Sequence, residues 1–314
     1  MVNISNSRFP LAHTFSVIAR DPQTGRLGVA AQSHWFSVGS LVTWAQAGIG
    51  AVATQAVVEV SYGPLGLDLM RAGFSAPEAL TKLLKADSGR AVRQVAMVDV
   101  KGRVAVHTGE RCVEAAGHYI GEGFSVQANM MTNATVWDAM AEAYQKAKGD
   151  LAERLLAALE AGQSAGGDIR GQQSAALLVV ADKPSGQPWK DTLINLRVED
   201  HPQPITELRR LVTLHKAYEL MNAGDQQLGQ GNIDEALERY RTAAQMAPSI
   251  VEMPFWHAVT LAELGRLEEA LPIFKQVFQK EPAWATLLQR LPRAGLLRDD
   301  LQMMRRILSL METT

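Results

Sequence analysis

The chain has 314 residues, enough for two ordinary domains, because single hydrophobic cores rarely grow beyond about 250–300 residues. Its 47% hydrophobic and 20% charged residues are typical of a globular protein. A net charge of −2 gives no overall attraction to nucleic acid or to an anionic membrane surface. We therefore expect neither as a partner.

Further absences narrow the class of protein. The only cysteine, Cys112, excludes an intrachain disulfide and a metal site built from several cysteines. The N-terminal residues lack the basic and then apolar order of a signal peptide, and no apolar run approaches 18 residues. We expect a soluble, cytoplasmic protein.

The first two hundred residues alternate short β-type runs with glycine turns. Thr14–Arg20 is followed by a turn at Asp21–Gly25 and a returning run at 26–32, which predicts two antiparallel strands. The same pattern recurs at 94–100 and 103–108. Further strands are expected at 49–54, 174–181 and 193–198.

Helices are expected between these strands. Ser75 and Glu78 have the spacing of a capping box and predict a helix to about residue 86. Residues 135–148 and 150–161 show apolar positions at helical spacing. Hairpins with inserted helices favour an antiparallel α+β design over a doubly wound sheet, and neither G-x-G-x-x-G nor a P-loop is present.

After residue 200 the pattern becomes continuously helical and repeats itself. The run from Gly231 to Leu237 returns 34 residues later as Gly265 to Leu271, and the prolines 248 and 282 keep the same offset. This period resembles the tetratricopeptide repeat. We place two units at 217–250 and 251–284, with capping helices at 205–214 and 299–311.

Within each unit the residue types have a packing reason. Ala236 and Ala270 are small enough for two helices to approach closely, and Tyr240 and Phe274 fill the space towards the next helix. Two units alone are too few for a continuous core, since about three are normally needed.

The first β-type run also carries the strongest chemical signal. Thr14 opens a strand that reaches Asp21 and a glycine turn, and the chain returns through small residues to Ser33. If the two strands pair, Ser33 becomes a neighbour of Thr14. The pattern continues in the segments 50–55 (GAVATQ), which contains Thr54, 62–64 (YGP), 107–109 (HTG) and 166–176 (GGDIRGQQSAA).

Together these segments resemble the N-terminal nucleophile (Ntn) hydrolases, closest in spacing to the isoaspartyl peptidase and glycosylasparaginase branch. The more complete match is to an uncharacterised bacterial family of this superfamily, a domain of unknown function that is often fused to other modules. The resemblance implies an αββα sandwich with antiparallel sheets at 14–200, a leader at 1–13 and an all-α tetratricopeptide-like domain at 201–314.

For activity, the resemblance implies an amidohydrolase with Thr14 as nucleophile and Ser33 as a second catalytic residue. A threonine hydroxyl needs an adjacent base, and the free α-amine of an N-terminal threonine can supply it. Thirteen residues precede Thr14, so the His13–Thr14 bond must first be cut, unless translation starts later. The proteasome variant is excluded because residues 27–81 contain no lysine. The alternative is that Thr14 is only a β-branched residue suited to a strand.

Four residues are candidates for substrate binding: Asp168, Arg170, His107 and Thr54. Asp168 and Arg170 lie in a glycine-rich loop and together could clamp an amino-acid-like substrate. The alternative is a turn with a solvated salt bridge. His107, at a strand end, is either a site residue or structural. The other histidines lack metal-ligand spacing, so we expect neither a metal nor another cofactor.

Two functions remain open. The first is hydrolysis of a small amide or amino-acid-like substrate through Thr14. The second is a non-catalytic sandwich whose helical repeats bind a peptide or a protein partner, as concave repeat surfaces often do. In either case we expect a homodimer.

Overall fold

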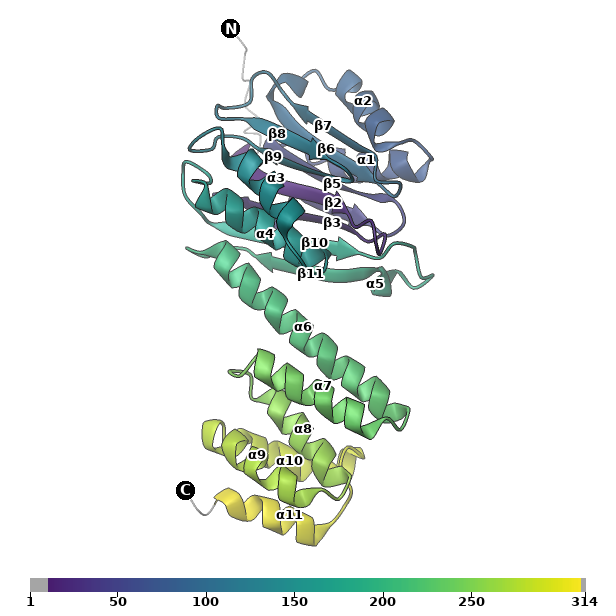
Figure 1. Ribbon diagram of the computed structural model, residues 1–314, viewed down its shortest axis with the longest axis vertical. Helices are drawn as coiled ribbons and strands as arrows, with labels where there is room; N and C mark the ends of the chain where they lie inside the picture. Colours follow the sequence, from purple (N-terminus) through teal and green to yellow (C-terminus); the bar gives the residue numbers. More distant parts are fainter. Residues whose placement is uncertain (1–10, 312–314) are drawn as a thin grey trace. The chain divides into compact units, whose positions relative to one another are not determined.

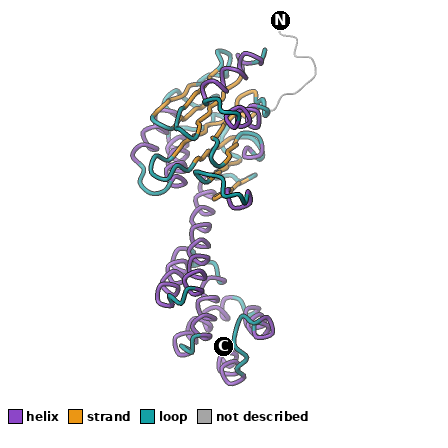
Figure 2. The backbone as a smooth tube through the Cα atoms, turned by 90° about the vertical axis from the view of Figure 1, so that its right-hand side faces the viewer, coloured by secondary structure: helices purple, strands orange, loops and turns teal. Residues whose placement is uncertain are grey.

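The computed structural model describes residues 11–311 and divides into two compact units, one ending at Leu211 and the other beginning at Val212. Figure 1 shows strands confined to the first unit, and Figure 2 shows helices and loops in the second. The predicted change from mixed to all-helical structure is confirmed, and the two units are described separately below.

The first unit contains two antiparallel sheets. Every strand pair in them is antiparallel, as predicted. In the first sheet the order is β1 (Leu11–Ala12), β5 (Gly50–Val57), β6 (Arg93–Asp99) and β7 (Val104–Thr108), with β4 (Thr43–Gln46) also on β5. In the second it is β11 (Thr192–Val198), β10 (Ser174–Val180), β3 (Leu27–Ser33), β2 (Thr14–Arg20), β9 (Phe124–Ala128) and β8 (Gly117–Gly121).

Helices cover the outer faces of both sheets. α1 (Tyr62–Arg71) and α2 (Ala76–Ala86) pack on the first sheet, and α3 (Val136–Lys146) and α4 (Leu151–Ser164) on the second. A buried apolar cluster that includes Ile18 and Val29 of one sheet and Ala51 and Ala96 of the other fills the space between the sheets. The layers therefore run helix, sheet, sheet, helix, and the predicted α+β class is confirmed.

The capping box is also confirmed. The Ser75 hydroxyl accepts from the backbone N–H of Glu78, and the Glu78 carboxylate accepts from the backbone N–H of Ser75. These contacts satisfy two backbone donors that a helix start leaves unpaired. The sequence pattern thus fixes where α2 begins.

Helix α1 was not predicted from the sequence, because its first residues include two glycines and a proline. The glycines are required by close packing. A Cβ on Gly63 would lie 2.4 Å from Cγ of Trp44, and one on Gly66 would lie 2.8 Å from Cε of Met97. Tertiary contact therefore overrides the low helix propensity here. Strands β4, β8 and β9 were also not predicted, and α5 (Pro188–Asp191) is a single turn.

The second unit is a stack of helices. The long helix α6 (Pro204–Gly229) crosses the division between the units, so the helix predicted at 205–214 is only its first part. After it come α7 (Ile233–Met246), α8 (Glu252–Glu263), α9 (Leu267–Lys280), α10 (Ala283–Arg290) and α11 (Leu301–Leu308). The four repeat residues Ala236, Tyr240, Ala270 and Phe274 are all buried in its core, as their pattern predicts.

Candidate functional site

Thr14 and Ser33 lie opposite each other. Thr14 begins β2 and Ser33 ends β3, and the antiparallel register pairs the two residues directly. Both are completely buried. Thr14 and Ser33 are therefore neighbours, as predicted. Both lie at one end of the space between the sheets.

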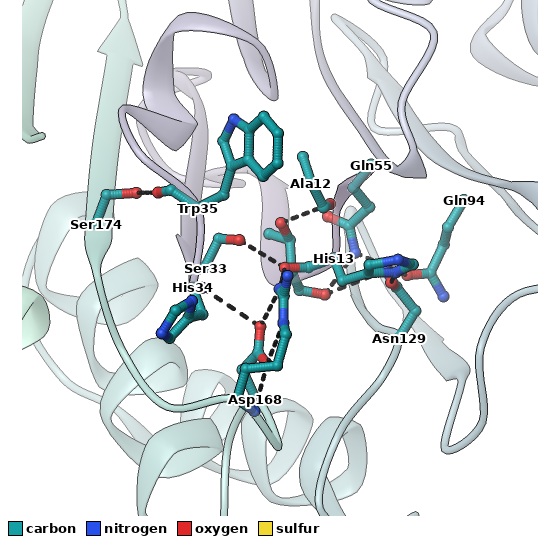
Figure 3. A network of polar contacts seen from close by, with 12 residues as sticks. Ala12, His13, Ser33, His34, Trp35, Gln55, Gln94, Asn129, Asp168 and Ser174 are labelled. Atoms are coloured by element: carbon teal, nitrogen blue, oxygen red, sulfur yellow. Dashed lines mark hydrogen bonds and ion pairs between the residues drawn. The ribbon is translucent and has the colours of Figure 1, made fainter. Parts of the chain in front are cut away.

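The peptide bond between His13 and Thr14 is called the junction below. Its carbonyl oxygen accepts hydrogen bonds from two side chains. The His13 carbonyl oxygen accepts from Ser33 Oγ at 2.5 Å (Figure 3). It also accepts from Arg170 Nη2, at 2.9 Å. One donor is a hydroxyl and the other a guanidinium. Together they would favour negative charge on this oxygen.

Asp168 orients the guanidinium. Its carboxylate accepts from Arg170 Nε at 3.0 Å and from Arg170 Nη2 at 2.7 Å. It also accepts from the backbone N–H of His34, at 3.3 Å. The Asp168 side chain is completely buried, and that of Arg170 keeps 28% of its exposure. The alternative interpretation, a solvated salt bridge, does not fit this pair, because the Asp168 carboxylate is buried. A buried carboxylate depends on hydrogen-bonding and charged partners inside the protein.

Glycines give the loop that carries this pair its shape. Gly166, Gly167 and Gly171 have positive φ angles of 123°, 60° and 105°. Residues with a Cβ rarely adopt such angles, so the glycine-rich sequence is explained by backbone conformation. The loop thereby brings Arg170 to His13 across 157 positions of the sequence.

The contacts of Thr14 itself are all to backbone or to amide side chains. Its hydroxyl donates to the carbonyl oxygen of Ala12 at 2.9 Å. Its own carbonyl accepts from Gln55 Nε2 at 3.0 Å and from Asn129 Nδ2 at 3.3 Å. A peptide carbonyl is too weak a base to activate a hydroxyl, so Thr14 is positioned here but not activated.

Buried amide side chains surround the junction from both sheets. Gln94 Oε1 accepts from Gln55 Nε2 at 2.7 Å and from Asn129 Nδ2 at 2.8 Å (Figure 3). Gln55, Gln94 and Asn129 are completely buried, and sequence analysis selected none of them. An amide side chain in an otherwise apolar strand is the signal that would have found them, since such groups need partners inside the protein.

The imidazole of His13 belongs to the same network. His13 Nδ1 lies 2.7 Å from Asn129 Oδ1. Burial lowers the pKa of His13 below its ordinary value, and the bond to Asn129 partly opposes this. The positive charge of Arg170 lowers the pKa further, while Asp168 raises it. The neutral imidazole is therefore favoured.

Two of the predicted substrate-binding residues lie apart from this network. The Thr54 hydroxyl donates to the carbonyl oxygen of Glu59 at 3.0 Å. His107 Nε2 lies 2.7 Å from the carbonyl oxygen of Arg90. Their sequence neighbours Gln55 and Thr108, by contrast, both contact Gln94. Roles for Thr54 and His107 in substrate binding stay predictions.

Backbone strain accompanies the site. Ala56, which pairs with Ala12, has φ of 74°, and Met130, which follows Asn129, has φ of 58°. Non-glycine residues with such angles cost of order 1–3 kcal/mol and cluster at functional sites. Each of the two thus lies beside the leader or beside a residue that contacts the junction.

Residues 11–311 present neither a cluster of metal-ligating side chains nor a helix suited to span a membrane. Within that range, no group of three or more His, Cys, Asp or Glu side chains is placed to hold a metal ion. None of the helices there combines the length and the apolar character needed to cross a bilayer. The first ten residues of the predicted leader lie outside the described part of the chain.

The fold and the junction define an α+β protein with two antiparallel sheets and a buried threonine, joined to helical repeats. Residues 14–208 match a family described as "Family of unknown function (DUF1028)", and the chain belongs to that family. Residues 227–291 match the tetratricopeptide repeat. The predicted resemblance to a domain of unknown function joined to tetratricopeptide repeats is thus confirmed.

A solved structure supports this assignment. The chain is similar to the crystal structure of protein SPO2555 from Silicibacter pomeroyi, whose title names the same family. The two share 34% sequence identity at a TM-score of 0.58, over 64% of this chain and 85% of that one. Among curated proteins, none matches the chain.

Proposed function

We propose that the protein is an amidohydrolase of the N-terminal nucleophile type, which cuts its own junction and then uses Thr14 to hydrolyse a small amide or amino-acid-like substrate. The observation that carries this proposal is the pair of donors on the His13 carbonyl oxygen, Ser33 Oγ and Arg170 Nη2. An attack on that carbonyl by the adjacent Thr14 hydroxyl would place negative charge on the oxygen. Preorganised donors at such a position are among the largest contributions to catalysis.

Self-cleavage would take place in two steps, formation of an ester and its hydrolysis. Thr14 Oγ bonds to the carbonyl carbon of His13, the carbon–nitrogen bond of the junction breaks, and the hydroxyl proton passes to the Thr14 nitrogen. The resulting ester is hydrolysed by one water molecule. The products are a carboxylate on His13 and a Thr14 that carries both a free amine and its hydroxyl.

Removal of the leader would expose the Thr14 hydroxyl and free the Thr14 nitrogen as an amine. Thr14 is completely buried while Ala12 and His13 cover it, so no external amide can reach its hydroxyl. In addition, its nitrogen is a peptide nitrogen and cannot act as a base. A free α-amine has an ordinary pKa of about 7.7–8.0, which suits a general base near neutral pH.

Turnover of an amide would then use the same groups. The amine takes the proton of the Thr14 hydroxyl, which attacks the amide carbon, and the same proton leaves with the departing amine. Ser33 and Arg170 would hold the oxygen of the tetrahedral intermediate. Water hydrolyses the acyl-enzyme ester and restores Thr14.

Intact mass of the purified full chain tests the proposal. We expect a species that begins at Thr14, and we expect Thr14→Ala to stay full length. The matched control is Thr81→Ala, because Thr81 also donates its hydroxyl to a backbone carbonyl, that of Pro77, but on an exposed part of α2. A wild-type chain that keeps residues 1–13 throughout would refute the hydrolase proposal.

A second candidate function concerns the helical repeats, a class of structure that commonly carries protein–protein contacts. We propose that they bind a peptide or protein partner. A groove of about 300 Å³ between α7, α8 and α9 supports this. His257 lines it together with side chains of both signs of charge: Asp234, Glu238, Arg241, Arg266 and Glu269.

Charge reversal at the groove tests the second candidate. With the full chain as bait, Arg241→Glu together with Arg266→Glu should abolish capture of a partner. Arg210→Glu, a reversal outside the groove in α6, should not. A partner captured equally well by all three proteins does not bind in this groove. The predicted homodimer is a separate proposal, which light scattering of the purified chain decides.

A further inference from the structure

The last residues of the leader occupy the site as an extended peptide. Leu11 and Ala12 form β1 and pair antiparallel with Val57 and Ala56 of β5. From this arrangement we infer the substrate class of the proposed enzyme. It acts on peptides whose acyl part lies along β5, with a small side chain two residues before the cleaved bond and a hydrogen-bond donor on the side chain directly before it. This inference rests on the proposed self-cleavage.

The backbone contribution comes from the edge of β5. β4 pairs with β5 only as far as Ala53, and β1 takes the same edge at Ala56 and Val57. Addition of an extended peptide to an exposed strand edge is a common way to bind peptides, because hydrogen bonds to the peptide backbone do not depend on its sequence. A substrate in place of the leader would meet the same edge in the same register.

The position of Ala12 selects by size. Ala12 is completely buried and belongs to the apolar cluster between the sheets, together with Val38, Val42 and Val58. Close-packed interiors leave no room for an isobutyl side chain in place of a methyl group. Leu11, by contrast, keeps 48% of its exposure, so the third residue before the cleaved bond is free to vary.

The position of His13 selects by hydrogen-bond chemistry. Asn129 Nδ2 is the donor towards the Thr14 carbonyl and Gln94 Oε1, so Asn129 Oδ1 is left as an acceptor. His13 Nδ1 lies 2.7 Å from that acceptor and must therefore carry the proton. A histidine, asparagine or glutamine supplies such a donor, and an ionised aspartate or glutamate does not.

Burial strengthens this selection. The His13 side chain lies in the buried network, and burial is the largest cause of the lowered pKa of its imidazole. A carboxylate at the His13 position would lose its hydration in the same way and would face the Asn129 oxygen, which is an acceptor. Unpaired buried charge is costly, so acidic residues should be rejected here.

The chemistry of an external substrate is ordinary amide hydrolysis. For acetyl-Leu-Ala-His-aminomethylcoumarin, Thr14 Oγ would bond to the histidine carbonyl carbon and aminomethylcoumarin would leave with the proton held by the Thr14 amine. One water molecule then releases acetyl-Leu-Ala-His as the free acid. No other reactant is needed.

The test compares self-cleavage of full-length variants by intact mass over time. We expect His13→Asn to retain cleavage, and His13→Asp, its isosteric counterpart, to slow it by about 100-fold or more, as for a site whose buried polar group is left unpaired. We expect Ala12→Leu to slow cleavage and Leu11→Gln to leave it within about threefold of wild type.

External peptides give an independent measurement, because Ala12→Leu can also disturb folding. Self-cleaved wild-type protein should hydrolyse the coumarin amide of acetyl-Leu-Ala-His and of acetyl-Leu-Ala-Asn. It should turn over those of acetyl-Leu-Ala-Asp and acetyl-Leu-Leu-His at least about tenfold more slowly. Equal rates for all four, or equal self-cleavage of His13→Asn and His13→Asp, overturn this inference alone. A wild-type chain that never cleaves overturns the proposed function and this inference with it.

Discussion

Gln55 Nε2 lies 3.0 Å from the carbonyl oxygen of Thr14, so a side chain of one sheet holds the backbone of the other. The same nitrogen lies 2.7 Å from Gln94 Oε1, and Gln55 Oε1 accepts from Ser16 Oγ at 2.5 Å. One amide thus joins β5, β6 and β2 between the sheets. Its removal would break these three buried hydrogen bonds and leave the hydroxyl proton of Ser16 without its acceptor.

We therefore predict that Gln55→Ala lowers the free energy of unfolding of the first unit by about 2–4 kcal/mol, because it breaks several buried hydrogen bonds that each contribute about 0.5–1.5 kcal/mol. Urea denaturation followed by near-ultraviolet circular dichroism measures it. Gln173→Ala is the matched control, since Gln173 bonds Asp200 at an exposed position and should cost less than about 0.5 kcal/mol. Equal effects from the two changes would contradict a structural role for the network.

The two donors on the His13 carbonyl oxygen give a kinetic prediction. Ser33→Ala removes one of them and should slow release of the leader by about 10²–10³-fold, the usual effect of losing one oxyanion donor. Arg170→Lys keeps the charge but loses the planar fork that bonds both Asp168 and His13, so we expect a similar loss. Intact-mass time courses measure both. Ser164→Ala, a hydroxyl at the exposed end of α4, is the control.

In the helical repeats, packing should dominate stability. Phe274 is completely buried among Phe255 and Phe278, and we expect Phe274→Ala to lower the free energy of unfolding of the second unit by about 3–5 kcal/mol. Far-ultraviolet circular dichroism during urea denaturation follows the helices. Leu301→Ala, at a side chain that is 71% exposed, should change little. A small effect at Phe274 would show that the core around it reorganises.

The stability of the second unit should also depend on pH. Burial, followed by the charges of Arg241 and Arg266, lowers the pKa of His257 below its ordinary value of 6.5. The unfolded chain then binds more protons than the folded one, so stability is present above pH 6.5 and falls as the pH drops below it. We expect His257→Gln to reduce the difference in thermal midpoint between pH 7.5 and pH 5.5. Leu301→Ala, which keeps His257, should retain the full difference.

Much of the fold could be predicted because local patterns determine it. Thr14 and Ser33 are correctly predicted as neighbours, since a tight turn between two strands of equal length fixes their register. The capping box at Ser75 and the 34-residue repeat are similarly local. Helix α1 was missed because its glycines follow from contacts with Trp44 and Met97, which are not visible in the local sequence.

The polar network shows where sequence reasoning reaches its limit. Thr54 and His107 were selected from their strands, whereas the network contains their neighbours Gln55 and Thr108, both of which contact Gln94. Successive side chains of a strand point to opposite faces, so a shift of one residue along a strand selects the other face of the sheet. Asn129 is brought to His13 across 116 positions of the sequence, a distance that no local pattern specifies.

The junction also sets a time at which the protein could mature. Its contacts come from Ser33, Gln55, Asn129 and Arg170, so a ribosome must pass the last of these before the His13 carbonyl meets both of its donors. Translation of the 157 residues from His13 to Arg170 takes on the order of ten seconds at ordinary rates. Loss of the first thirteen residues would then mark a chain whose sandwich had already formed around the junction.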